Sequence, residues 1–386
     1  MRTFVLVFFF TLSLALAGPD AVFYTQQNVL EGDQITTVQT PHRFPVGGIG
    51  QIDALTAKLT TPAKSATWAY DNDKKKWLLS DESGYTFAPQ RAKMLYQQAL
   101  AAGQPQFTLP VAYSQPARDV FYYYGLGIRE LLSEATTRFA GSSNERAFNL
   151  TLGASRLNGY VIPPNTVFSF AKAIGEISLA TGYKKAFVIS GEQTVEGVGG
   201  GMCQVSTTTF RAAYFAGLPI VDRRPHSYQV GYYKPAGLDA AVFLPERDFK
   251  FKNDTPGNIL IQTEVKGVYL TFRFFGTKDR SATWSDPVFL SRTPALPTRF
   301  IVSPNMRPQT FQQVDFAADG ASVRVTRTVQ FTDGHKLTDT LNSVYKPWGA
   351  VWLVGPGTKL RSGRVLTAAT DDSGGKGSYN TLTQTH

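Results

Sequence analysis

The sequence predicts an α+β protein of several domains in which strand content rises toward the C-terminus. The chain has 386 residues, more than one hydrophobic core usually serves. Apolar residues recur at helical spacing in some stretches and alternate in others. Glycine-containing turns separate pairs of alternating stretches. We therefore expect a small α+β N-terminal module, a mixed α+β central domain and a β-rich C-terminal module.

The first 17 residues have the layout of a secretory signal peptide. Basic Arg2 precedes an apolar run, and the small-residue stretch Ala15–Ala17 comes just before Gly18. We expect cleavage near Ala17–Gly18 and export to the cell envelope or the extracellular space. Residues 18–45 are mixed and polar with little periodicity, so we expect them to be a lead-in.

Residues 46–116 indicate a small α+β unit. The stretches "ATWAYD" and "KKWLLSD" flank a turn at Asn72–Asp73. A helix is expected next, because four apolar residues fall at helical spacing and Gly103 is placed to end it. Those four residues are Ala92, Leu95, Tyr96 and Ala99.

Residues 120–277 mix helical with strand-like stretches. "GLGIRELLSEATTRF" and "NERAFNLTLGASRLNG" favour helices, whereas "KAFVIS", "GNILIQTEV" and "GVYLTFRFFG" favour strands, the last two joined at Lys266–Gly267. Prolines between 287 and 308 then indicate an extended connection. Residues 306–357 contain a hairpin signal at Asp333–Gly334. Residues 358–386 are rich in Thr, Ser, Gly and charge, which predicts a disordered tail.

Composition narrows the classes of ligand. The formal net charge is +10, but the longest basic run, Lys74–Lys76, is expected in a turn, so anionic wall or envelope polymers are favoured over nucleic acid. A glycine run ends in Met202–Gln204 instead of the Lys-Ser/Thr of a phosphate-binding loop, which argues against a nucleotide. One cysteine and scattered histidines make a metal site unexpected, and no cofactor is predicted.

The one cysteine, Cys203, lies in "GVGGGMCQVSTTTF", residues 197–210. The apolar spacing that follows predicts a helix ending at Gly217. A cysteine at a helix N-terminus is surrounded by unpaired N–H groups that favour the thiolate. The loop residues Gly200, Gly201 and Gln204 are expected to hold a developing oxyanion. The competing interpretation is a small buried cysteine that only packs.

A cysteine nucleophile needs an imidazole, and His226 is the best placed of four histidines. It follows the cysteine by 23 positions, beyond the helix stop, where a returning chain could bring it back. Asp239 is the expected orienting carboxylate, with Asp222 as its rival and Ser227 or a backbone carbonyl as further alternatives. Arg223 and Arg224, with Ser227 beside them, are expected to bind a substrate carboxylate.

Five blocks in this order resemble the VanW domain, named from vancomycin-resistance operons. They span about residues 138–277 and read "PPNTVFSF", "GEISLATGYKKAFVI", "GVGGGMCQVSTTTF", "RRPHSYQVGYYKPAGLDAAVF" and "FKNDTPGNILIQTE". Pro164 and Met202 depart from the usual Gly and Ile without removing a chemical group. Residues 50–116 ("GYTFAP", "LPVAYSQP") resemble a peptidoglycan-binding module found upstream of that domain. Residues 306–357 resemble the wall-associated G-five module.

The resemblance implies an envelope protein that acts on, or attaches to, peptidoglycan. Some members of the family have been assigned L,D-transpeptidase activity with the motif cysteine as nucleophile, which here implies Cys203 with His226. A hydrolase would use the same residues and differ only in its acceptor. The alternative of another class is a non-catalytic wall-binding or adhesion protein in which Cys203 is structural.

Overall fold

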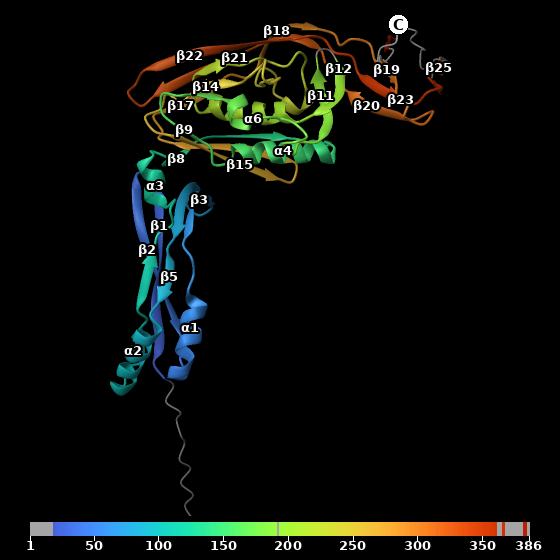
Figure 1. Cartoon of the computed structure of the whole chain (residues 1–386). Coiled ribbons are helices and arrows are strands. Elements are labelled where there is room, and N and C mark those ends of the chain that lie inside the picture. The colour runs from blue at the N-terminus through green and yellow to red at the C-terminus, as the bar shows by residue number, and fades with distance from the viewer. Residues whose placement is uncertain (1–17, 191–192, 361–364, 367–380, 384–386) are drawn as a thin grey trace, which may run out of the picture. The chain divides into compact units, whose positions relative to one another are not determined.

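The computed structural model describes residues 18–190, 193–360, 365–366 and 381–383, and it divides at Arg129 into two compact units. The structure is mixed, with 20% helix and 43% strand in several sheets (Figure 1). The sequence predicts three parts, whereas the contacts separate two units. The division between a central domain and a C-terminal module therefore stays a prediction. The expected signal peptide and most of the expected tail lie outside the described residues; the described tail residues include short strands.

The first unit is built on a sheet of order β2-β1-β4-β3, and β6 pairs in parallel with residues 20–22 at the start of β1, whereas β4 pairs with residues 29–30 near its end. Strands β5 and β7 form a separate antiparallel pair. Helix α2 buries Ala92, Tyr96 and Ala99 as its spacing predicts, and Gly103 follows it with φ +63°. The elements are β1 (Asp20–Glu31), β2 (Gln34–Phe44), α1 (Ile52–Leu59), β3 (Lys64–Asp71), β4 (Lys76–Glu82), β5 (Gly84–Phe87), α2 (Pro89–Ala101), β6 (Gln106–Thr108), β7 (Val111–Ser114) and α3 (Val120–Gly125).

The expectation that residues 18–45 are a lead-in is wrong. They form β1 and β2, and β1 is the central strand of the first sheet. The polar composition misled because β2 is mostly exposed, so only one face of the ribbon needs apolar residues. Ala21, Phe23 and Leu30 supply that face. Buried Asn28 is satisfied by Asp81.

The second unit begins at Glu130 and carries most of the strands. Its first sheet has the order β8-β16-β15-β9, and later strands form the sheets β17-β21-β18 with β22 on β21, and β20-β23-β19-β26. The elements up to residue 222 are β8 (Glu130–Arg138), α4 (Asn144–Leu157), β9 (Val161–Ile162), β10 (Val167–Ser169), α5 (Phe170–Ile174), β11 (Lys185–Ser190), β12 (Gln193–Val198), α6 (Met202–Phe215) and β13 (Ile220–Asp222). The later elements are β14 (Lys250–Lys252), β15 (Ile259–Lys266), β16 (Tyr269–Gly276), β17 (Arg280–Trp284), β18 (Val288–Thr293), β19 (Arg299–Val302), β20 (Phe311–Asp315), β21 (Gly320–Phe331), β22 (Lys336–Tyr345), β23 (Val351–Val354), β24 (Thr358–Lys359), β25 (Val365–Leu366) and β26 (Thr381–Thr383).

Helix α6 lies at the centre of the second unit, between the β8-β16-β15 sheet and the β21-β22 hairpin (Figure 1). Nearly every residue from Met202 to Tyr214 is buried. Phe210 packs in the same core as Phe249 and Phe272, and Arg327 of β21 donates to the carbonyl of Tyr214. Because the helix is enclosed, its first turn is held in a fixed position.

Two local expectations in the second unit are wrong, and the hairpins are confirmed. The stretch 130–138 is strand β8 instead of a helix, since pairing with β16 buries every second residue, Ser133, Ala135 and Thr137. The proline-rich connection contains strands β18 and β19. Turns at Lys266–Gly267 and Asp333–Gly334 join β15 to β16 and β21 to β22 as predicted.

Candidate functional site

The glycine run ends where α6 begins, and each glycine fits a tight space. Gly201 caps the helix with φ +112°, which disfavours any residue with a Cβ. A Cβ on Gly200 would lie 2.6 Å from the carbonyl oxygen of Phe187. The side chain of Asn149 in α4 fastens the run, donating to the carbonyls of Gly200 and Lys184 at 3.2 and 2.9 Å. The loop is therefore packed against α4 and β11.

Cys203 is the second residue of α6, at the helix N-terminus as predicted. Its Sγ lies 3.4 Å from the carbonyl oxygen of Val242, to which the thiol can donate. Among the described residues, no hydrogen-bond acceptor is found for the backbone N–H of Cys203. That N–H is therefore available to a developing oxyanion.

The oxyanion roles expected for Gly200, Gly201 and Gln204 stay predictions, and their contacts differ. Gly200 is buried against β11. The amide of Gln204 donates to the carbonyl of Gly201, and its side chain is held by Arg146 (2.7 Å) and Thr137 (3.1 Å). Gly201 lines the cavity beside Cys203.

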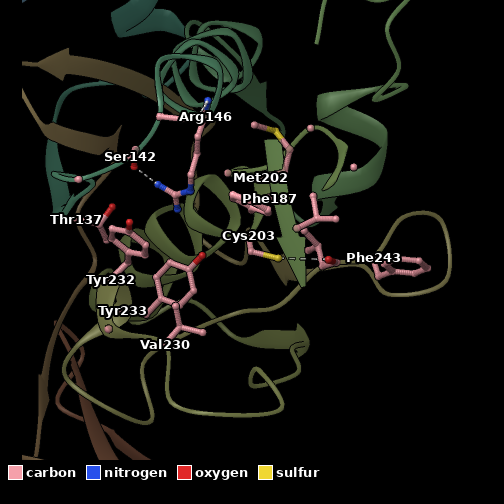
Figure 2. Close-up of a pocket in the computed structure, with 18 of the residues that line it drawn as sticks. Thr137, Ser142, Arg146, Phe187, Met202, Cys203, Val230, Tyr232, Tyr233 and Phe243 are labelled. Carbon is pink, nitrogen blue, oxygen red and sulfur yellow. Dashed lines mark hydrogen bonds between the residues drawn. The ribbon is translucent and has the colours of Figure 1, made fainter. Parts of the chain in front are cut away.

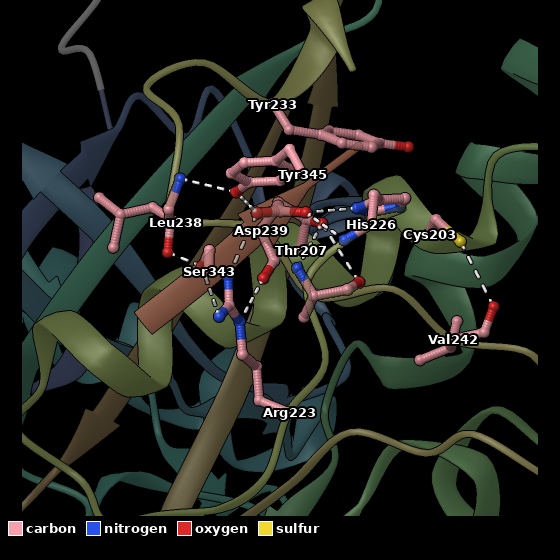
Figure 3. A network of polar contacts seen from close by, with 12 residues as sticks. Cys203, Thr207, Arg223, His226, Tyr233, Leu238, Asp239, Val242, Ser343 and Tyr345 are labelled. Carbon is pink, nitrogen blue, oxygen red and sulfur yellow. Dashed lines mark hydrogen bonds and ion pairs between the residues drawn. The ribbon is translucent and has the colours of Figure 1, made fainter. Parts of the chain in front are cut away.

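His226 and Asp239 meet in a buried hydrogen-bonded pair (Figure 3). The Nδ1 of His226 lies 2.6 Å from Oδ2 of Asp239, and the backbone N–H of His226 donates to the same oxygen at 2.8 Å. The other carboxylate oxygen accepts from the Tyr345 hydroxyl at 2.5 Å and from Arg223 at 3.2 Å. Both partners are about 97% buried, with exposures of 3%. Asp239 therefore holds His226 with Nδ1 protonated and Nε2 directed elsewhere.

Cys203 lies on the side of the His226 ring opposite Asp239 (Figure 3). In the described part of the chain, Nε2 is buried and forms no hydrogen bond with a nitrogen or oxygen atom, and the neighbouring group that interacts with the imidazole besides Asp239 is the Cys203 thiol. Burial lowers the pKa of His226, but Asp239 and the adjacent Cys203 outweigh it and raise this pKa to about 9. Burial raises the pKa of Cys203, but His226 outweighs it and lowers this pKa below the ordinary thiol value. The two directions favour a thiolate beside an imidazolium.

The three residues expected to bind substrate do not line the cavity beside Cys203. Arg223 is buried and donates to Asp239, to the Gly237 carbonyl and to Ser343, so it supports the orienting carboxylate. Arg224 is exposed, and the Ser227 carbonyl accepts from the Lys346 amide. Asp222, the rival orienter, is 3.7 Å from Lys250. The sequence could not reveal these partners, because Ser343 lies 120 residues from Arg223.

A cavity of about 1500 Å³ opens onto Cys203 (Figure 2). Aromatic residues Phe187, Tyr232, Tyr233 and Phe243 line it, together with Arg146 of α4. The segment 312–316 also contributes, so strands after residue 277 help to form the cavity. Such a mixed apolar and cationic cleft suits an extended, partly anionic ligand.

Sequence reasoning missed Arg146, Ser343 and Tyr345. The two β22 residues reach the site only through tertiary packing, and no local pattern marks them. Among the residues with described positions, no cluster of three or more His, Cys, Asp or Glu side chains could hold a metal ion. No helix in the same set is long and apolar enough to cross a membrane.

Residues 145–275 match the protein family described as "VanW like protein". The chain is 40% identical over 136 residues to "Uncharacterized protein YoaR" of Bacillus subtilis (strain 168), covering 35% of this chain and 45% of the relative. It is 32% identical over 144 residues to "Vancomycin B-type resistance protein VanW" of Enterococcus faecalis (strain ATCC 700802 / V583), covering 36% and 52%. The chain thus spans about half the length of these curated relatives. The matched segment contains Cys203, His226 and Asp239 but ends before Tyr345.

Proposed function

We propose that this protein is an exported, cell-wall-associated enzyme that transfers acyl groups of peptidoglycan stem peptides through Cys203, in the manner of an L,D-transpeptidase. The observation that carries the proposal is the buried Asp239–His226 pair next to Cys203, which itself lines a cavity of about 1500 Å³. Its VanW-like segment, and a relative named for vancomycin resistance, favour the cell wall as the setting.

In the first step, the Cys203 thiolate attacks the carbonyl carbon of the stem diamino acid and a C–S bond forms. The backbone N–H of Cys203 donates to the resulting oxyanion. The C–N bond to the terminal D-alanine then breaks, and the leaving amine takes the proton of His226 Nε2. Asp239 keeps Nδ1 protonated throughout and stabilises the imidazolium.

In the second step, a side-chain amine of a neighbouring stem attacks the thioester carbonyl. Its proton passes to His226, which now acts as the base, and the C–S bond breaks to restore the thiolate. Water in place of the amine would make the same site a hydrolase. Peptidoglycan is the partner in both cases, and anionic envelope polymers are further candidates for the basic surface.

D-Alanine release from disaccharide-tetrapeptide tests this proposal. We expect release by the mature protein, none by Cys203→Ala, and a fall of roughly 10²-fold or more in His226→Ala. Cross-linked dimer in the products would assign a transferase, and tripeptide alone a hydrolase. Release unaffected by Cys203→Ala would contradict cysteine catalysis.

One observation favours the non-catalytic alternative, a wall-binding protein with a structural cysteine. The Cys203 thiol already has an acceptor in Val242. A structural thiol would resist iodoacetamide until the protein unfolds, whereas a catalytic thiolate would react in the native state at neutral pH.

A further inference from the structure

Arg146 is a cation held at the cavity by neutral groups. It lies in the first turn of α4, and its guanidinium donates to Ser142 Oγ at 2.5 Å and to the Gln204 side chain at 2.7 Å. The guanidinium carbon also lies 4.4 Å from the centroid of the Tyr232 ring. Figure 2 shows Arg146, Tyr232, Tyr233 and Cys203 around one space. These contacts fix the orientation of the guanidinium.

Three other arginines of this unit have buried side chains and carboxylate partners, and Arg146 has no carboxylate partner in the described part of the chain. Arg223 pairs with Asp239, Arg280 with Asp254, and Arg327 with Asp339. The two side-chain hydrogen bonds of Arg146 occupy two of its five N–H groups. A held guanidinium with spare donors and no counter-charge is suited to an incoming carboxylate, which it can bind bidentately.

The other charged groups that line the cavity are less suited than Arg146 to bind a carboxylate. Arg211 donates to the backbone carbonyls of Leu238 and Tyr233 and is buried. Arg138 lines the cavity from β8 but is exposed. Among the residues whose side chains the structure describes, the carboxylates that line the cavity are Glu176 and Asp315, and neither is paired with Arg146. Arg146 is also close enough to Cys203 to contribute to lowering the pKa of the thiol.

We infer that Arg146 binds the terminal carboxylate of the acyl donor, the carboxylate carried by the residue that leaves when Cys203 is acylated. This inference rests on the proposed function and names its substrate class: peptides that end in a free carboxylate one residue beyond the bond that is cleaved. Donors with a blocked C-terminus are disfavoured because the guanidinium would face an uncharged group. Arg146 thus takes the role that the sequence suggested for Arg223 and Arg224.

The first test needs only the thiol and no assumption about the reaction. Iodoacetate carries a carboxylate and iodoacetamide does not, but both alkylate the Cys203 thiolate. The rate with iodoacetate divided by the rate with iodoacetamide is therefore independent of how much thiolate is present. This ratio measures how strongly the site attracts a carboxylate. We expect Arg146→Gln to lower this ratio by roughly tenfold, the change given by about 1.4 kcal/mol. Arg138→Gln, the same change in charge on the same cavity, should alter it less than about twofold. An unchanged ratio in Arg146→Gln, or equal falls in both variants, would overturn the inference.

The second test compares disaccharide-tetrapeptide as the free acid and as the C-terminal amide, by the rate of D-alanine or D-alaninamide release. The wild type and Arg138→Gln should prefer the acid, and Arg146→Gln should lose that preference. Arg146→Lys keeps the positive charge but cannot bind a carboxylate bidentately, so its preference for the acid should lie between those of the wild type and Arg146→Gln. It replaces Arg146→Gln in this comparison if that variant melts at a lower temperature. If no protein releases either product, the proposed function fails while the alkylation ratio still decides the role of Arg146.

Discussion

Tyr345→Phe removes one oxygen atom and tests whether the C-terminal strands complete the site. The Tyr345 hydroxyl donates to Asp239 Oδ1 at 2.5 Å and accepts from the Gly237 N–H at 2.8 Å, and all of these atoms are buried. Phenylalanine keeps the ring but leaves one buried N–H and one carboxylate oxygen each short of a partner. An unmade buried hydrogen bond costs about 1–3 kcal/mol, more when a charge is involved. We therefore expect the free energy of unfolding to fall by about 2–4 kcal/mol.

Urea unfolding followed by circular dichroism measures this change, and Tyr269→Phe is the matched control. Tyr269 is 49% exposed, so its hydroxyl can bond to water and the loss of that hydroxyl should change the unfolding free energy by less than about 0.5 kcal/mol. A Tyr345→Phe variant as stable as Tyr269→Phe would refute the claim that β22 supports Asp239. A large effect would show that the segment matched by the family, which ends at residue 275, depends on strands beyond it.

Three further predictions address the site. Because His226 lowers the pKa of Cys203, His226→Ala should move the pH profile of iodoacetamide alkylation to higher pH, so that reactivity at neutral pH falls. An unchanged profile would show that His226 does not affect the ionisation of Cys203. Asp239→Asn should bring the pKa of His226 down from about 9, since burial then acts without the carboxylate, and the imidazolium is lost at a lower pH; an NMR titration with the pKa still near 9 would refute this. Gly200→Ala should destabilise the protein by about 1–3 kcal/mol, because its Cβ would overlap the Phe187 carbonyl, whereas Gly231→Ala, with no atom within 4 Å, should not; equal stabilities in urea would contradict the packed loop.

The sequence correctly predicted the helices and turns that are specified by residues close together in the chain. The spacing of Ala92, Tyr96 and Ala99 is enough to specify α2, and glycine at the turns is enough for the later hairpins. Strand β8 has residues that also suit a helix, and its partner β16 lies more than 130 residues later. Strand β1 carries polar residues because much of its ribbon is solvated. Such elements are decided by distant pairing, which a single sequence does not display.

The same division holds for the site. Cys203, His226 and Asp239 could be suggested together because they lie within 37 residues, and the chain just after Asp239 contacts Cys203 through the carbonyl of Val242. The role of Arg223 could not be predicted, since its partners include a serine on β22. The contacts of Arg146 could not be predicted either, because its described side-chain partners include Gln204, 58 residues away.

Intact-mass spectrometry of the mature protein after incubation with disaccharide-tetrapeptide tests cysteine acyl transfer most directly. The account predicts a covalent adduct on Cys203, lighter than the added substrate by one D-alanine and absent from Cys203→Ala. No adduct, together with a thiol that resists iodoacetamide until denaturant is added, would contradict it and favour a wall-binding protein.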